Sequence, residues 1–263
     1  MRKTVAILLL VATIVSLTGC SLLYGNNTIK FDKKDALVIA HRGLSGLEVE
    51  NTESAFIAAG EHSYYGIEAD VRRTADGRFI ICHDATLEKL TGRDISVEAS
   101  TFDELMSIPL TEIKGQSGKE ERLTDLETYI SICKRYDKQA ILELKSSFSR
   151  EEISQIIKTI NEHNYLDRVI FISFDYDNLL YVREISPEQS VQYLFSEVTD
   201  EIIEKLIRDK VDAGINFTSL TKRILNKLHS AGLKVNCWTV DIPFIAEQLA
   251  NIGVDYITTN ILE

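Results

Sequence analysis

The sequence predicts an α/β protein, a (β/α)8 barrel with an extra hairpin strand and a longer loop segment over one end. From residue 37 onward, eight short apolar runs alternate with amphipathic segments of helical period. This alternation requires parallel strands joined by crossover helices. Eight such units in one domain favour a closed barrel over an open doubly wound sheet. A Rossmann-type sheet is the weaker alternative, because no G-x-G-x-x-G follows the first apolar run.

The N-terminal segment is predicted to be an export signal. Arg2 and Lys3 precede an uncharged run that is too short for a comfortable membrane span. The run ends in Leu17-Thr18-Gly19-Cys20, which resembles the lipobox of bacterial lipoproteins and implies cleavage before Cys20 and a lipid on its sulfur. The alternative is a plain N-terminal membrane anchor with an incidental cysteine. Either interpretation places the folded domain outside the cytoplasm, at the cell membrane.

The chain therefore divides into three expected parts: a lipoprotein signal peptide at residues 1–19, a lipidated tether at residues 20–36 and the barrel domain at residues 37–263. Residues 21–36 show no periodicity and interleave lysines with aspartates, which is typical of a tether. The formal charge of the chain is −11 at pH 7, and loss of Arg2 and Lys3 with the signal leaves −13. Such an acidic protein is a poor candidate for nucleic-acid binding, which relies on basic patches.

The cysteines that follow the predicted signal peptide do not indicate a disulfide framework. Cys82, Cys133 and Cys237 are an odd number, and the chain has no C-x-x-C. Neither a disulfide scaffold nor a sulfur-ligated zinc site is therefore expected.

The barrel strands are predicted at residues 37–40, 66–72, 139–144, 169–173, 190–195, 212–217, 234–240 and 255–258. Helices are predicted at residues 52–62, 151–163, 176–185, 200–208, 222–231 and 243–252. Residues 84–124 form the longest stretch outside this rhythm, with one possible helix at 102–106, and are expected to cover one end of the barrel.

Residues 79–82 form an additional strand that does not fit the alternation. Only a tight turn separates them from the strand at 66–72, so they are expected to fold back as a hairpin arm. A two-residue loop at Asp76-Gly77 would place His83 directly opposite Asp70, on the same face of the sheet. A three-residue loop would shift this register by one residue.

Three carboxylates are predicted to converge at one end of the barrel. Glu68 and Asp70 lie two apart on a strand and so share a face, and Glu143 occupies a similar place on a later strand. Such a group suits a hard divalent ion, Mg²⁺ or Ca²⁺, better than zinc. The alternatives are a solvated outer face for the first pair and a simple ion pair with Lys145 for Glu143.

Two histidines follow short apolar runs and so stand at strand ends. Either His41 or His83 alone would be read as a core histidine. Beside a carboxylate cluster they are better interpreted as a general acid and base, because imidazole both takes and gives protons near neutral pH. Arg42 offers a bidentate fork for a phosphate, with Lys145 as a second cation.

These residues belong to a longer set of motifs. The set comprises His41-Arg42-Gly43, Glu50-Asn51-Thr52-Glu53-Ser54-Ala55-Phe56, Gly66-Ile67-Glu68-Ala69-Asp70-Val71, Thr74-Ala75-Asp76-Gly77, His83-Asp84, Leu123-Thr124-Asp125-Leu126-Glu127, Leu142-Glu143-Leu144-Lys145, Ser173-Phe174-Asp175 and Trp238-Thr239-Val240. In order and spacing it resembles the signature of the glycerophosphodiester phosphodiesterase family. The family fold is a (β/α)8 TIM barrel, and its members release glycerol 3-phosphate and an alcohol using a divalent metal and two histidines.

The resemblance implies a role for each matching residue. It makes His41 and His83 the acid and base pair, Glu68, Asp70 and Glu143 the metal ligands, and Arg42 and Lys145 the phosphate contacts. Glu50 would border the metal site, and Trp238 would wall the glycerol side. The chain departs from the family pattern at Val49, where proline is usual, and at Asn260, where aspartate is usual.

The expected function is metal-dependent hydrolysis of a small glycerophosphodiester by an enzyme anchored outside the cytoplasm. Attack by water and attack by the glycerol 2-hydroxyl through a cyclic phosphate both remain open. Two alternatives also remain: a phospholipase D-like enzyme that forms a cyclic phosphate from lipids, and a lipoprotein that binds a glycerophosphodiester without cleaving it. The sequence does not choose between the two histidines or between the two metals.

Overall fold

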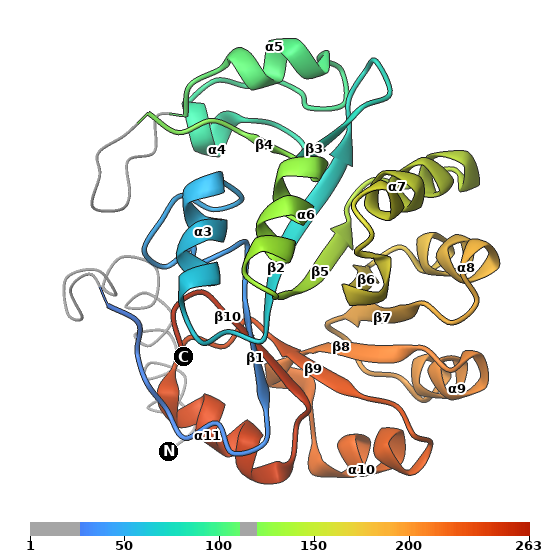
Figure 1. Ribbon diagram of the computed structural model, residues 1–263. Coiled ribbons are helices and arrows are strands. Elements are labelled where there is room, and N and C mark those ends of the chain that lie inside the picture. The colour runs from blue at the N-terminus through green and yellow to red at the C-terminus, as the bar shows by residue number, and fades with distance from the viewer. Residues whose placement is uncertain (1–26, 111–119) are drawn as a thin grey trace, which may run out of the picture.

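Eight parallel strands form a closed ring surrounded by helices in the computed structural model, which describes residues 27–110 and 120–263 (Figure 1). The ring consists of β1 (Leu37–Ala40), β2 (Gly66–Arg73), β5 (Gln139–Leu144), β6 (Val169–Ser173), β7 (Ser190–Phe195), β8 (Asp212–Asn216), β9 (Val235–Trp238) and β10 (Tyr256–Thr259). Because β1 pairs with both β2 and β10, the ring has no open edge. The predicted (β/α)8 TIM barrel is confirmed.

The expected crossover helices are also present. They are α3 (Glu53–Glu61), α7 (Arg150–Glu162), α8 (Tyr176–Ile185), α9 (Asp200–Asp209), α10 (Lys222–Ser230) and α11 (Pro243–Ile252), with short 3-10 turns at Leu166–Arg168 and Phe217–Ser219. A further helix, α6 (Leu126–Arg135), was not predicted. Its N-cap Asp125 accepts the Thr128 N–H, and its buried residues follow helical spacing. This helix connects the hairpin region to β5.

A small apolar cluster fills the inside of the ring beneath the C-terminal ends of the strands. It consists of Ile39, Ile141, Ile170, Ile172, Leu194 and Tyr256. A much larger core lies between the strands and the helices. Glu143 lies two residues beyond Ile141 on the same face of β5. A layer of polar side chains therefore begins directly above this small apolar cluster. That end of a (β/α)8 barrel is where active sites are built.

The extra hairpin strand is confirmed, but its predicted register is wrong by one residue. β3 (Phe79–Ile81) runs antiparallel to β2, with Arg73 opposite Phe79. In this register Asp70 faces Cys82, whose N–H donates to the Asp70 carbonyl oxygen at 2.8 Å. His83 is therefore the next residue beyond the pair.

The length of the hairpin loop explains the shift. The Thr74 N–H donates to the Arg78 carbonyl at 2.9 Å, which leaves three residues in the loop instead of two. Gly77 donates to the Thr74 carbonyl at 3.0 Å and adopts φ +76, a left-handed conformation that suits glycine. One extra loop residue moves every opposed pair by one.

The stretch after the hairpin forms a separate cap with its own apolar cluster. It contains α4 (Glu88–Thr91), α5 (Phe102–Ser107) and β4 (Thr124–Asp125), which pairs with β3. The cluster comprises Val49, Ile80, Cys82, Leu87, Leu90, Val97, Phe102, Leu105, Leu110 and Leu123. Figure 1 shows α4 and α5 grouped at one side of the ring, beyond β3. The described part of this stretch is thus an ordered layer that packs on the hairpin arm.

The second half of the expected tether lies against the barrel. Ile29 pairs in parallel with Leu262, and the Thr28 hydroxyl donates to the Glu263 carboxylate at 2.7 Å. The predicted signal peptide and Cys20 lie outside the described residues. Within residues 27–110 and 120–263, no helix is long and apolar enough to cross a membrane.

Candidate active site

Three buried carboxylates meet where β2 and β5 end. Asp70 and Glu143 are direct neighbours in the parallel register of these strands, and Glu68 lies two residues before Asp70 on the same face. One oxygen of each lies within 4.8 Å of the others. Their exposed fractions are 2% for Glu68, 0% for Asp70 and 7% for Glu143. The structure therefore brings together the three side chains predicted to hold a metal.

The electrostatics of this cluster favour a bound cation. Burial raises the pKa of Glu68 well above its usual range, and Asp70 and Glu143 add to that effect. Burial together with the Asp70 carboxylate raises the pKa of Glu143 to about 7. Burial also disfavours the charge of Asp70, but Arg42, with His83 and Lys145, lowers its pKa to about 2. Arg42, His83 and Lys145 thus compensate the negative charge of the three carboxylates only in part. An additional cation would stabilise the cluster.

Unsatisfied oxygen atoms point to the same conclusion. Glu68 Oε1 and Asp70 Oδ1 are buried and have no hydrogen-bond partner among the described residues. Buried carboxylate oxygens without partners are costly, and a hard divalent ion takes oxygen ligands of this kind. The donor set therefore fits Mg²⁺ or Ca²⁺. It contains no sulfur or nitrogen that would favour zinc.

A left-handed turn after β1 wraps backbone around the same cluster. Arg42 has φ 55, Gly43 has φ 74, and the Arg42 N–H donates to Glu68 Oε2 at 2.7 Å. A Cβ on Gly43 would lie 2.6 Å from the Ala55 backbone, so only glycine fits. Non-glycine residues with positive φ are uncommon and gather at functional sites. The turn fixes where His41 and Arg42 leave the barrel wall.

The two predicted phosphate contacts both border the carboxylates. The Arg42 guanidinium lies between Glu50 Oε1, at 2.9 Å, and Asp70 Oδ2, at 3.4 Å. Lys145 Nζ lies 2.9 Å from Glu143 Oε1 and 3.8 Å from Asp70 Oδ1. The expected ion pair between Lys145 and Glu143 is present, and it does not remove Glu143 from the cluster.

Glu50 lies at the border of the site, as expected. Its second oxygen accepts a hydrogen bond from Lys89 Nζ at 2.5 Å, so one carboxylate joins the cap to Arg42. Glu50 also lies with His83 and Asp84 in a second group whose possible ligand atoms are within 4.8 Å of one another. Because Arg42 and Lys89 already hold both Glu50 oxygens, the first cluster is the better cation site.

His41 projects from the end of β1 into the polar layer. Its Nδ1 lies 2.8 Å from Asn260 Oδ1, and its Nε2 lies 4.0 Å from Glu68 Oε2. Burial, and after it the Arg42 guanidinium, lowers the pKa of His41 to about 4. The imidazole is therefore neutral at pH 7 and able to accept a proton.

His83 reaches the site from the hairpin arm instead of a barrel strand. Its Nδ1 lies 2.7 Å from Asp84 Oδ1. Arg72 donates to its carbonyl oxygen from Nε at 3.0 Å and from Nη2 at 2.8 Å. Burial lowers the pKa of His83, while the nearby Asp70 carboxylate opposes that change. The side chains of His83 and Asp70 thus interact electrostatically, although the predicted pairing of the two residues is wrong.

An aromatic wall completes the mouth. The rings of Trp238, at the end of β9, and Phe174, after β6, meet edge to face with centroids 5.4 Å apart. Phe174 is 47% exposed, and the Trp238 Nε1 donor is buried with no hydrogen-bond partner in the described chain. Phe174 also lines a hollow of about 470 Å³ together with Glu143 and Lys145.

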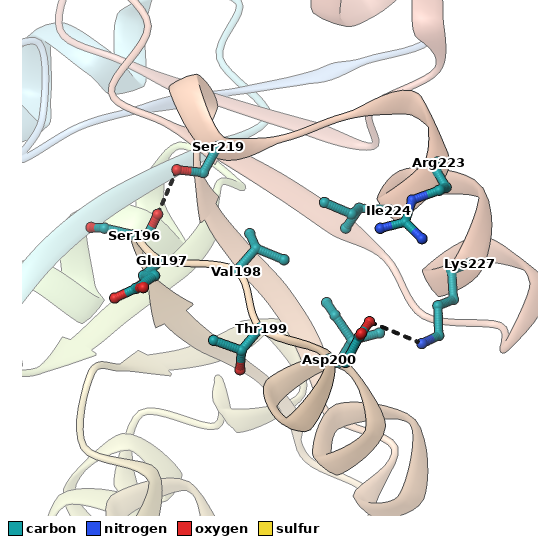
Figure 2. Close-up of a pocket in the computed structure, with 10 residues that line it drawn as sticks. Ser196, Glu197, Val198, Thr199, Asp200, Ser219, Arg223, Ile224 and Lys227 are labelled. Atoms are coloured by element: carbon teal, nitrogen blue, oxygen red, sulfur yellow. Dashed lines mark hydrogen bonds and ion pairs between the residues drawn. The ribbon is translucent and has the colours of Figure 1, made fainter.

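A hollow of about 560 Å³ lies elsewhere, between the loops that lead into α9 and α10. Figure 2 shows its wall, with the Ser219 hydroxyl bonded to the Ser196 carbonyl on one side and Lys227 facing Asp200 on the other. Neither histidine and none of the clustered carboxylates lines it. This hollow is therefore separate from the site formed by the two histidines and the carboxylate cluster.

Several functional contacts were missed in the sequence. Asn51, at φ 59, donates from Nδ2 to Asp70 Oδ2 at 2.7 Å and so orients a metal-ligand candidate. Asn260, one of the two departures from the family pattern, lies against His41. Arg72 was not considered. Its place two residues after Asp70 on one strand face was the signal that could have found it.

The comparisons with known proteins agree with this geometry. A sequence model of the glycerophosphoryl diester phosphodiesterase family matches residues 41–263. A glycerophosphodiester phosphodiesterase of Caldanaerobacter subterraneus subsp. tengcongensis is 30% identical over 85% of this chain and 93% of its own. A glycerophosphodiester phosphodiesterase of Bacillus subtilis is 26% identical over 85% of this chain and 83% of its own.

A solved structure shows the same likeness. The Oleispira antarctica phosphodiesterase in complex with the product sn-glycerol-3-phosphate has a TM-score of 0.80 and 28% identity, covering 85% of this chain and 92% of its own. The family match at residues 41–263 spans both histidines, the carboxylate cluster and the aromatic wall. The chain therefore belongs to the glycerophosphoryl diester phosphodiesterase family of enzymes.

Proposed function

We propose that this protein hydrolyses glycerophosphodiesters to glycerol 3-phosphate and an alcohol, with a divalent cation held by Glu68, Asp70 and Glu143. One observation carries the proposal: a buried carboxylate cluster with unpartnered oxygens lies beside two histidines whose Nδ1 atoms are both engaged. The Nε2 atom of each ring is then left for substrate protons. A binding protein has no use for this pairing, which weakens the non-catalytic alternative.

The cation would neutralise charge on the phosphodiester, as bound divalent ions do in phosphoryl transfer. Arg42 and Lys145 border the same carboxylates and are placed to bind the phosphate oxygens. Preorganised positive charge of this kind usually supplies the largest share of the barrier reduction. These two side chains would therefore bind the substrate and stabilise the charge that develops.

The two histidines would carry the proton transfers. His41, neutral at pH 7, would take the proton from the attacking oxygen, and His83 would give one to the departing alcohol. The hydrogen-bond partners support this order: an Asp84 carboxylate stabilises a protonated His83 better than the Asn260 amide stabilises a protonated His41. Either water or the glycerol 2-hydroxyl can be the attacking group in this scheme.

The aromatic wall gives the substrate an orientation. The exposed Phe174 ring and the partly exposed Trp238 ring offer apolar surface to the glycerol carbons. With the phosphate at Arg42, this places the glycerol toward β6 and β9 and the alcohol toward the cap. The identity of the alcohol would then depend on the cap.

The test is a turnover assay with glycerophosphocholine in the presence and absence of Mg²⁺ or Ca²⁺. His41→Ala and His83→Ala should each lower kcat by roughly 10²- to 10⁴-fold, the usual worth of general acid or base catalysis. His163→Ala is the matched control, because the hydrogen bond of that ring in the described chain is with the exposed Ser131 hydroxyl, away from the carboxylate cluster. Near wild-type turnover in either of the first two variants would contradict the assignment. A ³¹P NMR time course would show whether a cyclic phosphate forms.

We also propose that the enzyme is exported and anchored by a lipid on Cys20. The charged start, short apolar run and lipobox-like cysteine support this proposal. Labelled palmitate should enter the wild-type protein in its native host but not the Cys20→Ala variant, and the mature chain should begin at Cys20. A mature chain that begins elsewhere, or one without lipid, would contradict it.

A further inference from the structure

A line of hydrogen bonds runs from the loop before α11 to the His41 ring. Asn260 donates to Asp241 twice, from its backbone N–H to Oδ1 at 2.8 Å and from Nδ2 to Oδ2 at 2.6 Å. At the other end of the same amide, Asn260 Oδ1 lies 2.8 Å from His41 Nδ1. Among the described contacts Asp241 does not touch the carboxylate cluster, and it acts on His41 through the Asn260 amide and through its own charge.

The orientation of the Asn260 amide follows from its partners. An ionised carboxylate can only accept hydrogen bonds, so the amide must turn its NH₂ group toward Asp241. Its oxygen then faces His41. The Ser45 hydroxyl lies 2.8 Å from the same oxygen and 2.7 Å from the His41 carbonyl oxygen, and its single hydrogen can go to only one of the two. Asp241 thus determines which end of the amide the histidine meets.

This orientation determines where the His41 proton sits. Facing an oxygen that cannot donate, Nδ1 must carry the hydrogen, and Nε2 keeps its lone pair. Nε2 is the atom on the side of the carboxylate cluster, 4.0 Å from Glu68 Oε2. We propose that Asp241 and Asn260 are positioning residues that hold His41 in the tautomer protonated on Nδ1, so that Nε2 accepts the proton of the attacking oxygen.

The step balances with the two histidines. The O–H bond of the attacking water or hydroxyl breaks as its oxygen bonds to phosphorus, and the proton forms a bond with Nε2. The P–O bond to the alcohol breaks, and the departing oxygen takes a proton from His83. The His41 ring becomes a cation whose Nδ1–H still donates to Asn260. This inference rests on the proposed function for its kinetic consequence, but the tautomer itself is a property of the resting protein.

The chain offers an exchange experiment. In this chain an amide, Asn260, stands between the His41 ring and the Asp241 carboxylate. In Asp241→Asn the partner has both a donor and an acceptor, so the Asn260 amide is free to flip. In the double variant Asp241→Asn/Asn260→Asp the carboxylate accepts directly from His41 Nδ1, and the amide at 241 can donate to it. The exchange therefore restores the tautomer that the single change releases.

The first measurement is steady-state turnover of glycerophosphocholine at saturating metal. Asp241→Asn and Asn260→Ala should lower kcat by about 10-fold or more with KM little changed, as expected when an interaction acts on the chemical step. The exchange variant should recover most of the lost kcat. Asp255→Asn is the matched control, because Asp255 contacts His229 Nε2 at 2.8 Å far from the carboxylate cluster. Its kcat should stay at the wild-type value.

The second measurement does not depend on activity. ¹⁵N NMR of histidine-labelled, metal-free protein reports which nitrogen of His41 carries the proton, with His41→Ala providing the assignment. Wild type and the exchange variant should show a protonated Nδ1, and Asp241→Asn should show a mixture of tautomers. If no glycerophosphodiester is turned over but this pattern holds, the proposed function fails and the positioning role stands. An unchanged tautomer in Asp241→Asn, or a folded exchange variant no better than the single one, would overturn the inference.

Discussion

Replacing Glu143 by glutamine should make the metal-free protein more stable at pH 8 and change little at pH 4.5. Burial and the Asp70 carboxylate raise the pKa of Glu143 from 4.5 to about 7. Below pH 4.5 this group is protonated in both folded and unfolded chains, so it has no pH-dependent effect. Between pH 4.5 and 7 the folded state holds a proton that the unfolded state has lost. Stability therefore falls as pH rises through this window and stays low above it.

The magnitude follows from the two pKa values. At about 1.36 kcal/mol per pH unit, the difference between 4.5 and about 7 corresponds to about 3 kcal/mol. His41 acts in the opposite sense, because its folded pKa of about 4 makes stability rise with pH up to its unfolded value. The wild-type curve alone therefore does not isolate the carboxylate. The difference between Glu143→Gln and wild type cancels the contribution of His41 and keeps that of Glu143 together with its effect on the Glu68 pKa. It should grow by about 3 kcal/mol from pH 4.5 to 7.

The assay is urea unfolding of both proteins in a chelating buffer at half-unit pH steps. Glu151→Gln is the control, because Glu151 is exposed in the first turn of α7, and its difference from wild type should stay flat. With a divalent cation at 100 times its dissociation constant, the wild type should gain about 2.7 kcal/mol, and Glu143→Gln should gain less. A difference curve that is independent of pH would refute the argument that Glu143 is an uncompensated buried acid.

Three further outcomes are expected. Arg72→Ala should lower kcat by about 10-fold with KM little changed, because the His83 carbonyl loses two donors; combined with His83→Ala it should have no additional effect on kcat in the same assay. Trp238→Ala should raise KM for glycerophosphocholine more than it lowers kcat, since it removes an aromatic wall for the glycerol. Tyr129→Phe should cost about 1 kcal/mol in urea unfolding with activity retained, because the Tyr129 hydroxyl donates to a β2 carbonyl at 2.8 Å; unchanged stability would contradict that reasoning.

The barrel strands were predictable because each is a short apolar run bounded by turn residues. This pattern can be recognised without knowledge of the tertiary contacts. The six helices found share an amphipathic stripe. Helix α6 was missed although Leu126, Tyr129 and Cys133 have helical spacing, because it follows the irregular cap without a clear break. The hairpin register depended on whether Gly77 closes a two- or three-residue loop, a choice that sequence alone leaves nearly balanced.

The site residues could be predicted where the residue type itself indicates the chemistry. Paired acids on one strand face and histidines at strand ends led to Glu68, Asp70, Glu143, His41 and His83. The residues that orient them were harder to find, because their roles depend on contacts between distant segments. Asn260 meets His41 across 219 positions, and Asn51 meets Asp70 across 19. An amide in a loop gives no sign in the sequence of which side chain it will hold.

The cap has a consequence for how the enzyme loses activity on warming. Its apolar cluster includes Ile80 and Cys82 on the hairpin, whereas the barrel has its own, much larger core. Two cores of unequal size open with different free energies, and the smaller one defines a local cooperative unit. Amide hydrogens of Leu87 and Leu105 should therefore exchange with solvent before those of the ring strands. Each such opening would release His83 and the Lys89 contact to Glu50, so catalytic competence would be lost at temperatures where the barrel is still folded.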